Sequence, residues 1–592
     1  MKKKWMTWIC IIAVCLQATG CQNINKKNND KTEEKTVDSK EEQAAFDEFT
    51  NELFVKKVQE DGITLNYTLS KPEDYGITDV TPTLGEFGVD ASRQAIAEAE
   101  NINQRLSEFE YSALTKEQQL TYDVMEDYYR ISDDEEEYLL YGEALGNTTG
   151  IQAQLPILLS EYNMDDKEDV ETYLSLLLTV DDYFQQIEDY EKEKSDAGLF
   201  MSDHNADNII SQCEDFIKNP DENLLITIFE DRIDKFDWLT KKEKKSFKKE
   251  NKNAVKNTII PAYEGLIDTL EALKGTGKCD PGVGNLPNGK EYYEQLAQSI
   301  TGSDKTVSDM KSALTKTMQQ SATRLSLMAS NDDTLENDYL SMKFPMTDPD
   351  DILEYLTDAV KEDFPALENV NYTVKYVDKS LEDHVSPAFY LTPQLDNYTE
   401  NSIYINGASD NDLSQIFTTL AHEGYPGHLL QSVYFNQHNN SPIRSLLSYG
   451  GYSEGWATYC ELYSYNIAGL EDNLGEFAKQ YMIFNLCLYA QIDIGVNYDC
   501  WSEDDLFEYL GNYGITDRDA TSQIFDIVVD DPANYLQYVI GYIEFMELRE
   551  EAEDTLGDDF NAKEFHTFLL DTGDAPFSVI EKHMQDWMEE QK

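Results

Sequence analysis

Apolar residues recur at three- and four-residue steps along most of this chain, which is the spacing of amphipathic helices. The stretch ETYLSLLLTVDDYFQQIEDYEKEK, residues 171 to 194, shows this spacing clearly. Alternation typical of strands is scarce, and its best candidates are NYTVKYVD, residues 371 to 378, and NSIYING, residues 401 to 407. These two segments could pair as a small sheet. The sequence therefore predicts a mainly α fold, a large multi-helical scaffold with at most a small β-sheet.

Two interruptions of the helical spacing suggest where domains begin and end. Residues 21 to 44 are polar and charged without apolar periodicity, which predicts a disordered tether. Five glycines and two prolines gather in GTGKCDPGVGNLPNG, residues 275 to 289. We therefore expect an N-terminal helical region over residues 45 to 275 and a second helical region over residues 276 to 592. Six of the seven histidines lie in the second region, so the chemistry is expected there.

Charge narrows the choice of partners. The 592 residues carry a formal charge of −67, and 41% of them are apolar, enough to bury a large core. Binding to nucleic acid needs a net cationic face, so nucleic acid is excluded as a partner. The basic concentration KKEKKSFKKENK, residues 241 to 252, is interpreted as a solvated helix face. The acidic excess is typical of a protein that works outside the cell or at its surface.

The N-terminus predicts export. Three lysines, an apolar stretch too short to span a bilayer and then small residues make up residues 1 to 20, the layout of a secretion signal. Ala18-Thr19-Gly20-Cys21 resembles the bacterial lipobox, which implies diacylation of Cys21 and attachment to the bacterial cell membrane on its extracytoplasmic side. The alternative is an uncleaved anchor helix, and in either case the body of the protein is exported.

The stretch HEGYPGH, residues 422 to 428, begins like the zinc-peptidase signature HExxH, but its second histidine comes two residues late. Two histidines that share a zinc ion need ring nitrogens roughly 3.3 Å apart, since Zn–N bonds are about 2.0 to 2.1 Å long. Positions six apart in a regular helix are separated by about 9 Å of rise and about 120° of rotation. The intervening Pro-Gly pair cannot continue a regular helix. We therefore predict that the helix breaks between Tyr425 and His428, so that His428 turns back towards His422.

A third ligand is expected from the segment that follows Gly450 and Gly451. There, Ser453 is predicted to cap a helix that begins at Glu454, 26 residues after His428. This spacing suits zinc peptidases whose third ligand is a glutamate on a second helix. Glu461 falls on the same helix face two turns later, placed for a hydrogen bond to a ligand histidine. The predicted zinc ligands are thus His422, His428 and Glu454.

These residue types indicate hydrolysis by a metal-activated water. Two imidazoles and one carboxylate leave a coordination position for water, whose pKa zinc lowers towards neutrality. Glu423, next to a ligand but not itself a ligand, is the predicted general base. A donor to the oxyanion is also needed. DPANYLQYVIGY, residues 531 to 542, offers Tyr535, Tyr538 and Tyr542, of which we favour Tyr538; the alternative is that these tyrosines only pack.

HEGYPGHLLQ followed by SEGWATYCE resembles the bacterial family of domain of unknown function 885 (DUF885), whose pattern is HExxPGHxxQ followed by EGWAxYxE. The likeness covers nearly all of residues 45 to 590, and the family groups by resemblance with the gluzincin metallopeptidases. It implies a helical scaffold with a deep cleft over the metal. The roles that it implies are metal ligation by His422, His428 and Glu454, base catalysis by Glu423, and a place beside the ligands or in the cleft for Gln431.

The sequence departs from the family pattern before its Trp-Ser motif. The family has a DxGxH element there, and this chain has Asn497 in place of the histidine. Leu486 and Tyr489 occupy positions where the family often has arginines. If the family's histidine assists substrate binding, this chain must use Asn497 or a tyrosine instead.

Three functional hypotheses remain open at this stage. The leading one is an exported, lipid-anchored zinc metallopeptidase that hydrolyses short peptides, which are favoured because the resemblance implies a deep cleft. The rival is a non-catalytic peptide-binding lipoprotein on the same scaffold, and the third is another amide or ester hydrolase. Glu423 favours an enzyme, since binding alone requires no general base. The expected partners are short peptides and, through the N-terminal lipid only, the membrane; the oligomeric state is undetermined.

Overall fold

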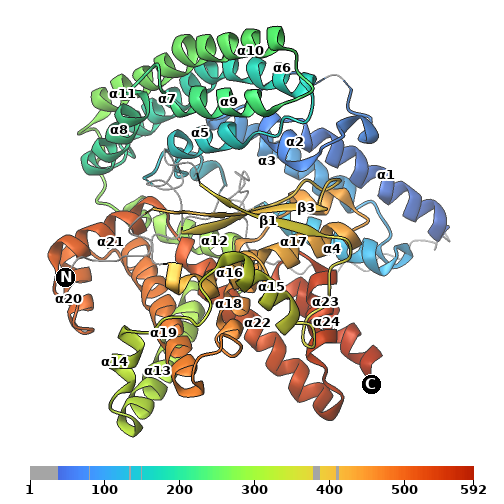
Figure 1. Cartoon of the computed structure of the whole chain (residues 1–592), viewed down its shortest axis with the longest axis vertical. Helices are drawn as coiled ribbons and strands as arrows, with labels where there is room; N and C mark the ends of the chain where they lie inside the picture. Colours follow the sequence, from blue (N-terminus) through green and yellow to red (C-terminus); the bar gives the residue numbers. More distant parts are fainter. Residues whose placement is uncertain (1–37, 79, 132–134, 148–149, 378–386, 409–412) are drawn as a thin grey trace, which may run out of the picture.

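A computed structural model describes residues 38 to 592 except 79, 132–134, 148–149, 378–386 and 409–412. Helices dominate the described chain, with one small sheet among them, so the predicted mainly α fold is confirmed (Figure 1). The predicted secretion signal and Cys21 lie outside the described residues. Within the described part, no helix has the length and apolar character needed to cross a membrane.

The first helices are α1 (Ser39–Val58), α2 (Gly62–Thr68), α3 (Val89–Leu106) and α4 (Lys116–Tyr128). Helix α1 corrects the predicted tether, which we expected to extend to residue 44. Asp38 caps the helix by accepting a hydrogen bond from the Lys40 amide, and Phe46 and Phe49 are buried from the same helix. Regular structure therefore begins at Ser39, directly after the capping aspartate.

A second layer of helices covers the top of the molecule in Figure 1. It consists of α5 (Ile151–Glu161), α6 (Lys167–Leu176), α7 (Val180–Ala197), α8 (Asp203–Ile217), α9 (Leu224–Lys235), α10 (Lys241–Ala254) and α11 (Ile260–Leu273). The lysine run forms α10, which starts with a capping box between Thr240 and Glu243 and buries Phe247. Most of its lysines are exposed, as a solvated helix face requires.

The buried side chains form two main cores. One contains residues between 46 and 129 together with residues between 283 and 588, and the other contains mainly the helices α5 to α11. A small cluster of Ile157, Val377, Phe389 and Tyr404 joins α5 to the sheet. The glycine-rich break at 275–289 thus lies where the chain passes from the second core back to the first. The separate domains that we expected there stay a prediction.

The chain returns through α12 (Gly289–Thr301), α13 (Val307–Asn331), α14 (Leu335–Leu340) and α15 (Pro349–Ala359) to the sheet of β1 (Asn371–Tyr376), β2 (Ala388–Leu391) and β3 (Glu400–Ile405). The strand order is β1-β3-β2, with β1 parallel and β2 antiparallel to β3. The predicted pairing of β1 with β3 is therefore confirmed. The edge strand β2 was not predicted, because four residues are too few to show a period.

The remaining helices are α16 (Ile416–Glu423), α17 (His428–His438), α18 (Gly450–Ser464), α19 (Asp472–Asn497), α20 (Glu503–Gly511), α21 (Arg518–Asp530), α22 (Asn534–Leu556), α23 (Ala562–Thr572) and α24 (Phe577–Gln591). The predicted cap at Ser453 is wrong, because α18 already begins at Gly450. A Cβ atom on Gly451 would lie 2.0 Å from the carbonyl oxygen of Thr301. Gly450 and Gly451 therefore lie inside the first helical turn and not before the helix, and the close packing there requires glycine at position 451.

Candidate metal centre

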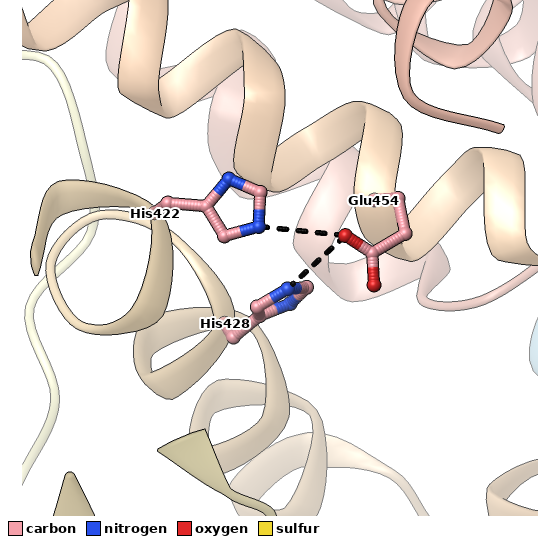
Figure 2. A group of neighbouring side chains, drawn as sticks. All are labelled: His422, His428 and Glu454. Carbon is pink, nitrogen blue, oxygen red and sulfur yellow. Dashed lines mark ion pairs between the residues drawn. The ribbon is translucent and has the colours of Figure 1, made fainter. Parts of the chain in front are cut away.

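His422, His428 and Glu454 converge from three helices, α16, α17 and α18 (Figure 2). Glu454 Oε2 lies 3.4 Å from His422 Nε2 and 3.6 Å from His428 Nε2. One ligand atom from each residue lies within 4.8 Å of the others, and all three side chains are largely buried. The structure thus brings together the three residues that the sequence predicted as ligands.

The convergence depends on a loop between α16 and α17. Helix α16 ends at Glu423 and α17 begins at His428, so the predicted break of the helix is confirmed, although it starts at Gly424, before the predicted Tyr425. The Gly427 amide donates to the carbonyl oxygen of Ala421 at 3.0 Å and folds the loop back onto α16. A Cβ atom at Gly427 would lie 1.8 Å from the carbonyl oxygen of His422, so only glycine fits here.

Helix α18 contributes two glutamates from one face. Glu454 faces both histidines, and Glu461, seven residues later, places Oε2 3.3 Å from His422 Nδ1. The two nitrogens of the His422 ring therefore face different carboxylates. A carboxylate that accepts a hydrogen bond from Nδ1 leaves the lone pair of Nε2 directed at a metal, which is a common arrangement around ligand histidines.

Glu423 occupies a different environment from Glu454. Its Oε2 accepts a hydrogen bond of 2.9 Å from the backbone amide of Tyr390 in β2. Burial raises the pKa of Glu423, an effect that the two nearby imidazoles oppose. For Glu454, burial also acts to raise the pKa, but the imidazoles of His428 and His422 outweigh it and the pKa is lowered. The surroundings thus shift the pKa values of the two buried carboxylates in opposite directions. This suits a Glu454 that stays charged and a Glu423 that exchanges a proton.

The distances fit a shared divalent cation. Bonds of about 2.0 to 2.2 Å in tetrahedral geometry place ligand atoms roughly 3.3 to 3.5 Å apart, close to the 3.4 and 3.6 Å measured from Glu454. Both distances are longer than hydrogen bonds usually are. Two histidines and one carboxylate also form a ligand set that catalytic zinc sites use. The residues present therefore fit a metal ion held by His422, His428 and Glu454.

Gln431 lies beside the cluster, where its Oε1 is 3.5 Å from His428 Nδ1. Tyr538 is buried on α22, the helix that packs against α18, with 7% of its surface exposed. The oxyanion role predicted for Tyr538 stays a prediction.

Asn497 lies in the protein interior. Its side-chain amide donates to Asp493 Oδ1 at 3.2 Å and to the carbonyl oxygen of Val528 at 2.8 Å, and its oxygen accepts from the Val283 amide at 3.3 Å. The side chain is fully buried. These contacts join α19 to its neighbours, and the role suggested for Asn497 in substrate binding stays a prediction.

No sequence pattern points to the Tyr390 amide as a partner of Glu423. Every residue except proline has the same backbone amide, so the residue type does not show which amide will bind a side chain. The run Ala-Phe-Tyr-Leu that forms β2 is also short and uniformly apolar. Trp456 and Cys460 were also missed, although both contact the loop between α16 and α17. Their spacing of four on a helix marks one flank of α18, but only the folded chain shows that this flank meets the loop.

Solved structures share this fold at low sequence identity. A candidate lipoprotein from Colwellia psychrerythraea matches with a TM-score of 0.79 and 16% identity, over 93% of this chain and 99% of that one. A candidate lipoprotein of unknown function from Shewanella oneidensis matches with a TM-score of 0.62 and 16% identity, over 93% and 100%. A candidate oligoendopeptidase F from Bacillus anthracis str. Ames reaches a TM-score of only 0.30 at 11% identity, over 85% and 97%, which is too low to indicate a shared fold.

No curated protein matches the sequence. The family model described as "Bacterial protein of unknown function (DUF885)" matches residues 73–584. That match contains all three candidate ligands and Glu423, and it confirms the resemblance stated from the two sequence motifs. The chain belongs to the DUF885 family.

Proposed function

We propose that this protein is an exported, lipid-anchored zinc metallopeptidase that hydrolyses short peptides. The observation that supports it best is the convergence of His422, His428 and Glu454, with Glu423 next in sequence to a ligand. Such a site, buried inside a helical scaffold, combines a metal ligand set with a proton acceptor.

The roles of the residues follow from their surroundings. His422, His428 and Glu454 would hold the zinc ion, which when bound supplies a Lewis acid and lowers the pKa of a water molecule. Glu423 would accept the proton of that water and donate it to the leaving amine. Its raised pKa makes this carboxylate a stronger base than an exposed glutamate. The Tyr390 amide holds one of its oxygens, which leaves the other to exchange the proton.

The sheet supports a peptide as the substrate. In the described sheet β2 is an edge strand, and the amide of its Tyr390 points to Glu423 and not to β3. In an antiparallel pair a residue directs its amide and its carbonyl to the same side, so this edge faces the candidate metal centre. Extended peptides bind to sheet edges through backbone hydrogen bonds. Because β2 is buried and its Tyr390 amide already donates to Glu423, a peptide would use the remaining backbone groups of this edge.

Lipid anchoring is supported by the leader and by the structural relatives. Cys21 follows an apolar stretch in a lipobox-like context. The two solved structures with TM-scores of 0.79 and 0.62 are described as candidate lipoproteins. We therefore propose that the helical body lies outside the cytoplasm and is held at the membrane by the lipid on Cys21.

Metal analysis combined with a peptide-library digest tests the proposal. Purified protein is expected to contain about one zinc ion per chain and to cleave short peptides. Glu423→Gln should keep the metal and lose about 10²-fold to 10⁴-fold in kcat, the range for loss of a general base. Glu336→Gln on α14, an exposed glutamate, is the matched control and should be fully active.

Each rival hypothesis has its own outcome in this experiment. Hydrolysis that is unaffected by Glu423→Gln would contradict the mechanism. Stoichiometric zinc without cleavage of any peptide would favour the peptide-binding lipoprotein. Zinc-dependent cleavage of model esters or other amides, with peptides left intact, would favour another hydrolase at the same site.

A further inference from the structure

The carbonyl group of Pro426 lies in the loop between α16 and α17 and points at α18. The indole nitrogen of Trp456 donates to it at 3.0 Å, and the thiol of Cys460 approaches it at 3.4 Å. Neither side chain is exposed. Because the Pro-Gly insertion interrupts the helical hydrogen bonds, a carbonyl in this loop needs partners from elsewhere, and α18 supplies both.

Helix α18 therefore acts on the metal centre in three ways. Glu454 faces both histidines, and Glu461 faces His422 Nδ1. Trp456 and Cys460, four residues apart on another flank, hold the loop that leads directly into His428. The direction of the His428 side chain depends on that loop, since α17 begins at this residue.

We propose that Trp456 is a positioning residue for His428, with Cys460 as the weaker second donor. The indole N–H holds the Pro426 carbonyl, and the loop so held keeps the His428 imidazole in reach of Glu454. This inference rests on the proposed function, because it assumes that the three residues bind a metal ion. Trp456 is fully buried and is not one of the three candidate ligands, so in this proposal it acts only through the loop.

A purely structural role for Trp456 is the competing explanation. Its ring packs among Phe364, Phe545 and His566, each with a ring centroid 5.9 Å away. The two explanations make different demands on the side chain. Packing depends on the volume of the indole, whereas positioning depends on its N–H. Because Trp456→Phe removes the N–H together with part of the ring, the unfolding midpoint measures the loss of packing and the zinc affinity measures the loss of positioning.

The experiment measures zinc affinity of the mature protein by competition with a chelator, beside the thermal unfolding midpoint of the metal-free protein. Trp456→Phe is expected to weaken zinc binding about 10-fold to 100-fold, as loss of a partner that orients a ligand does. Cys460→Ser, which keeps a donor, should bind zinc like the unaltered chain.

Tyr459→Phe is the matched control on the same helix. It also removes a buried aromatic donor, the hydroxyl that lies 2.9 Å from His566 Nε2, but it does not touch the loop. It should lower the unfolding midpoint without a change in zinc affinity.

Two outcomes would overturn the inference alone. One is zinc affinity of Trp456→Phe equal to that of the unaltered chain, and the other is an equal loss in Tyr459→Phe, which would indicate general loosening of α18. If the unaltered chain binds no zinc, the proposed function fails together with the inference, so the two failures are distinguishable.

Discussion

His422 shows how much a single residue can be constrained by its neighbours on one helix. Its two ring nitrogens face Glu454 and Glu461, which are seven residues apart on α18. Helical periodicity places such a pair on one face, so the contact of Glu461 could be predicted without a structure. The environment of Glu423 could not, because its partner is a backbone amide from a strand more than thirty residues away in sequence.

His566 is a second buried histidine, and it is held in its neutral form. Its Nδ1 donates to the carbonyl oxygen of Asp363 at 2.6 Å, and its Nε2 accepts from the Tyr459 hydroxyl at 2.9 Å. Burial lowers the pKa of His566 to about 4. Because Nε2 is already an acceptor, protonation would break the bond from Tyr459 and place a charge in the core.

The pKa of His566 predicts a loss of stability in acid. The folded state binds the proton more weakly than the unfolded state, whose histidine titrates near pH 6.5, so stability is present above that pH and falls towards pH 4. Between pH 7.5 and pH 5.0 the loss from this residue is about 2 kcal/mol. Urea unfolding measures the free energy of unfolding at both pH values. Between them this free energy should fall by about 2 kcal/mol less in His566→Gln, which keeps one donor and one acceptor, than in the unaltered chain.

Other buried groups titrate over the same pH range, but they are shared by both proteins and cancel in this comparison. An equal drop in His566→Gln and in the unaltered chain would contradict the assignment.

At the scale of elements, the crossing of α18 and α22 positions the helix that carries Glu454 of the candidate metal centre. A Cβ atom on Gly455 would lie 2.6 Å from the backbone of Gly541, so the two helices touch through their main chains. This contact explains the glycine of the Glu-Gly-Trp-Ala motif as a packing requirement. Because Glu454 directly precedes Gly455, the distance between the two helices also affects how far the Glu454 carboxylate lies from the histidines.

Gly455→Ala should therefore destabilise the protein and disturb the metal centre together. Overpacking at such a contact costs about 1 to 3 kcal/mol in the free energy of unfolding. We also expect weaker zinc binding, because α18 must move away from α22. Urea unfolding and chelator competition measure the two effects.

Gly511→Ala at the end of α20 is the control, since no atom lies within 4 Å of the added Cβ. That substitution should leave stability unchanged or raise it by about 0.4 to 1 kcal/mol. Equal behaviour of the two alanine variants would show that the crossing tolerates a side chain.

At the scale of the whole molecule, the chain folds around two cores with the sheet between them (Figure 1). The candidate metal centre belongs to elements of the first core, and α5 of the second layer contacts the sheet through Ile157. The charge of −67 keeps such a body soluble and repels it from anionic surfaces. Attachment to a membrane then depends on the lipid proposed for Cys21.

Cys21→Ala should release the protein from the membrane. In the native bacterium the variant is expected in the soluble extracytoplasmic fraction, while the unaltered chain partitions into a detergent phase, because an acyl chain adds about 0.8 kcal/mol of membrane affinity per buried CH₂ group. Cys15→Ala, inside the leader, is the control and should stay anchored. Continued membrane association of Cys21→Ala would favour the alternative of an uncleaved anchor helix.

The sequence by itself determined the features that depend on local spacing. It predicted the mainly helical fold, the pairing of β1 with β3, the break before His428 and the convergence of His422 with Glu454. Helical periodicity and the backbone limits of proline and glycine act over a few residues, so one chain segment is enough to predict them.

Only the tertiary structure decided the features that join distant segments. The strand β2 beside Glu423, the burial of Asn497, the start of α18 at Gly450 and the donors from Trp456 and Cys460 to the loop are all contacts between elements. Such contacts depend on which backbones pack closely enough to exclude a side chain or to offer an amide. That packing is a property of the assembled core, and no spacing along the chain encodes it.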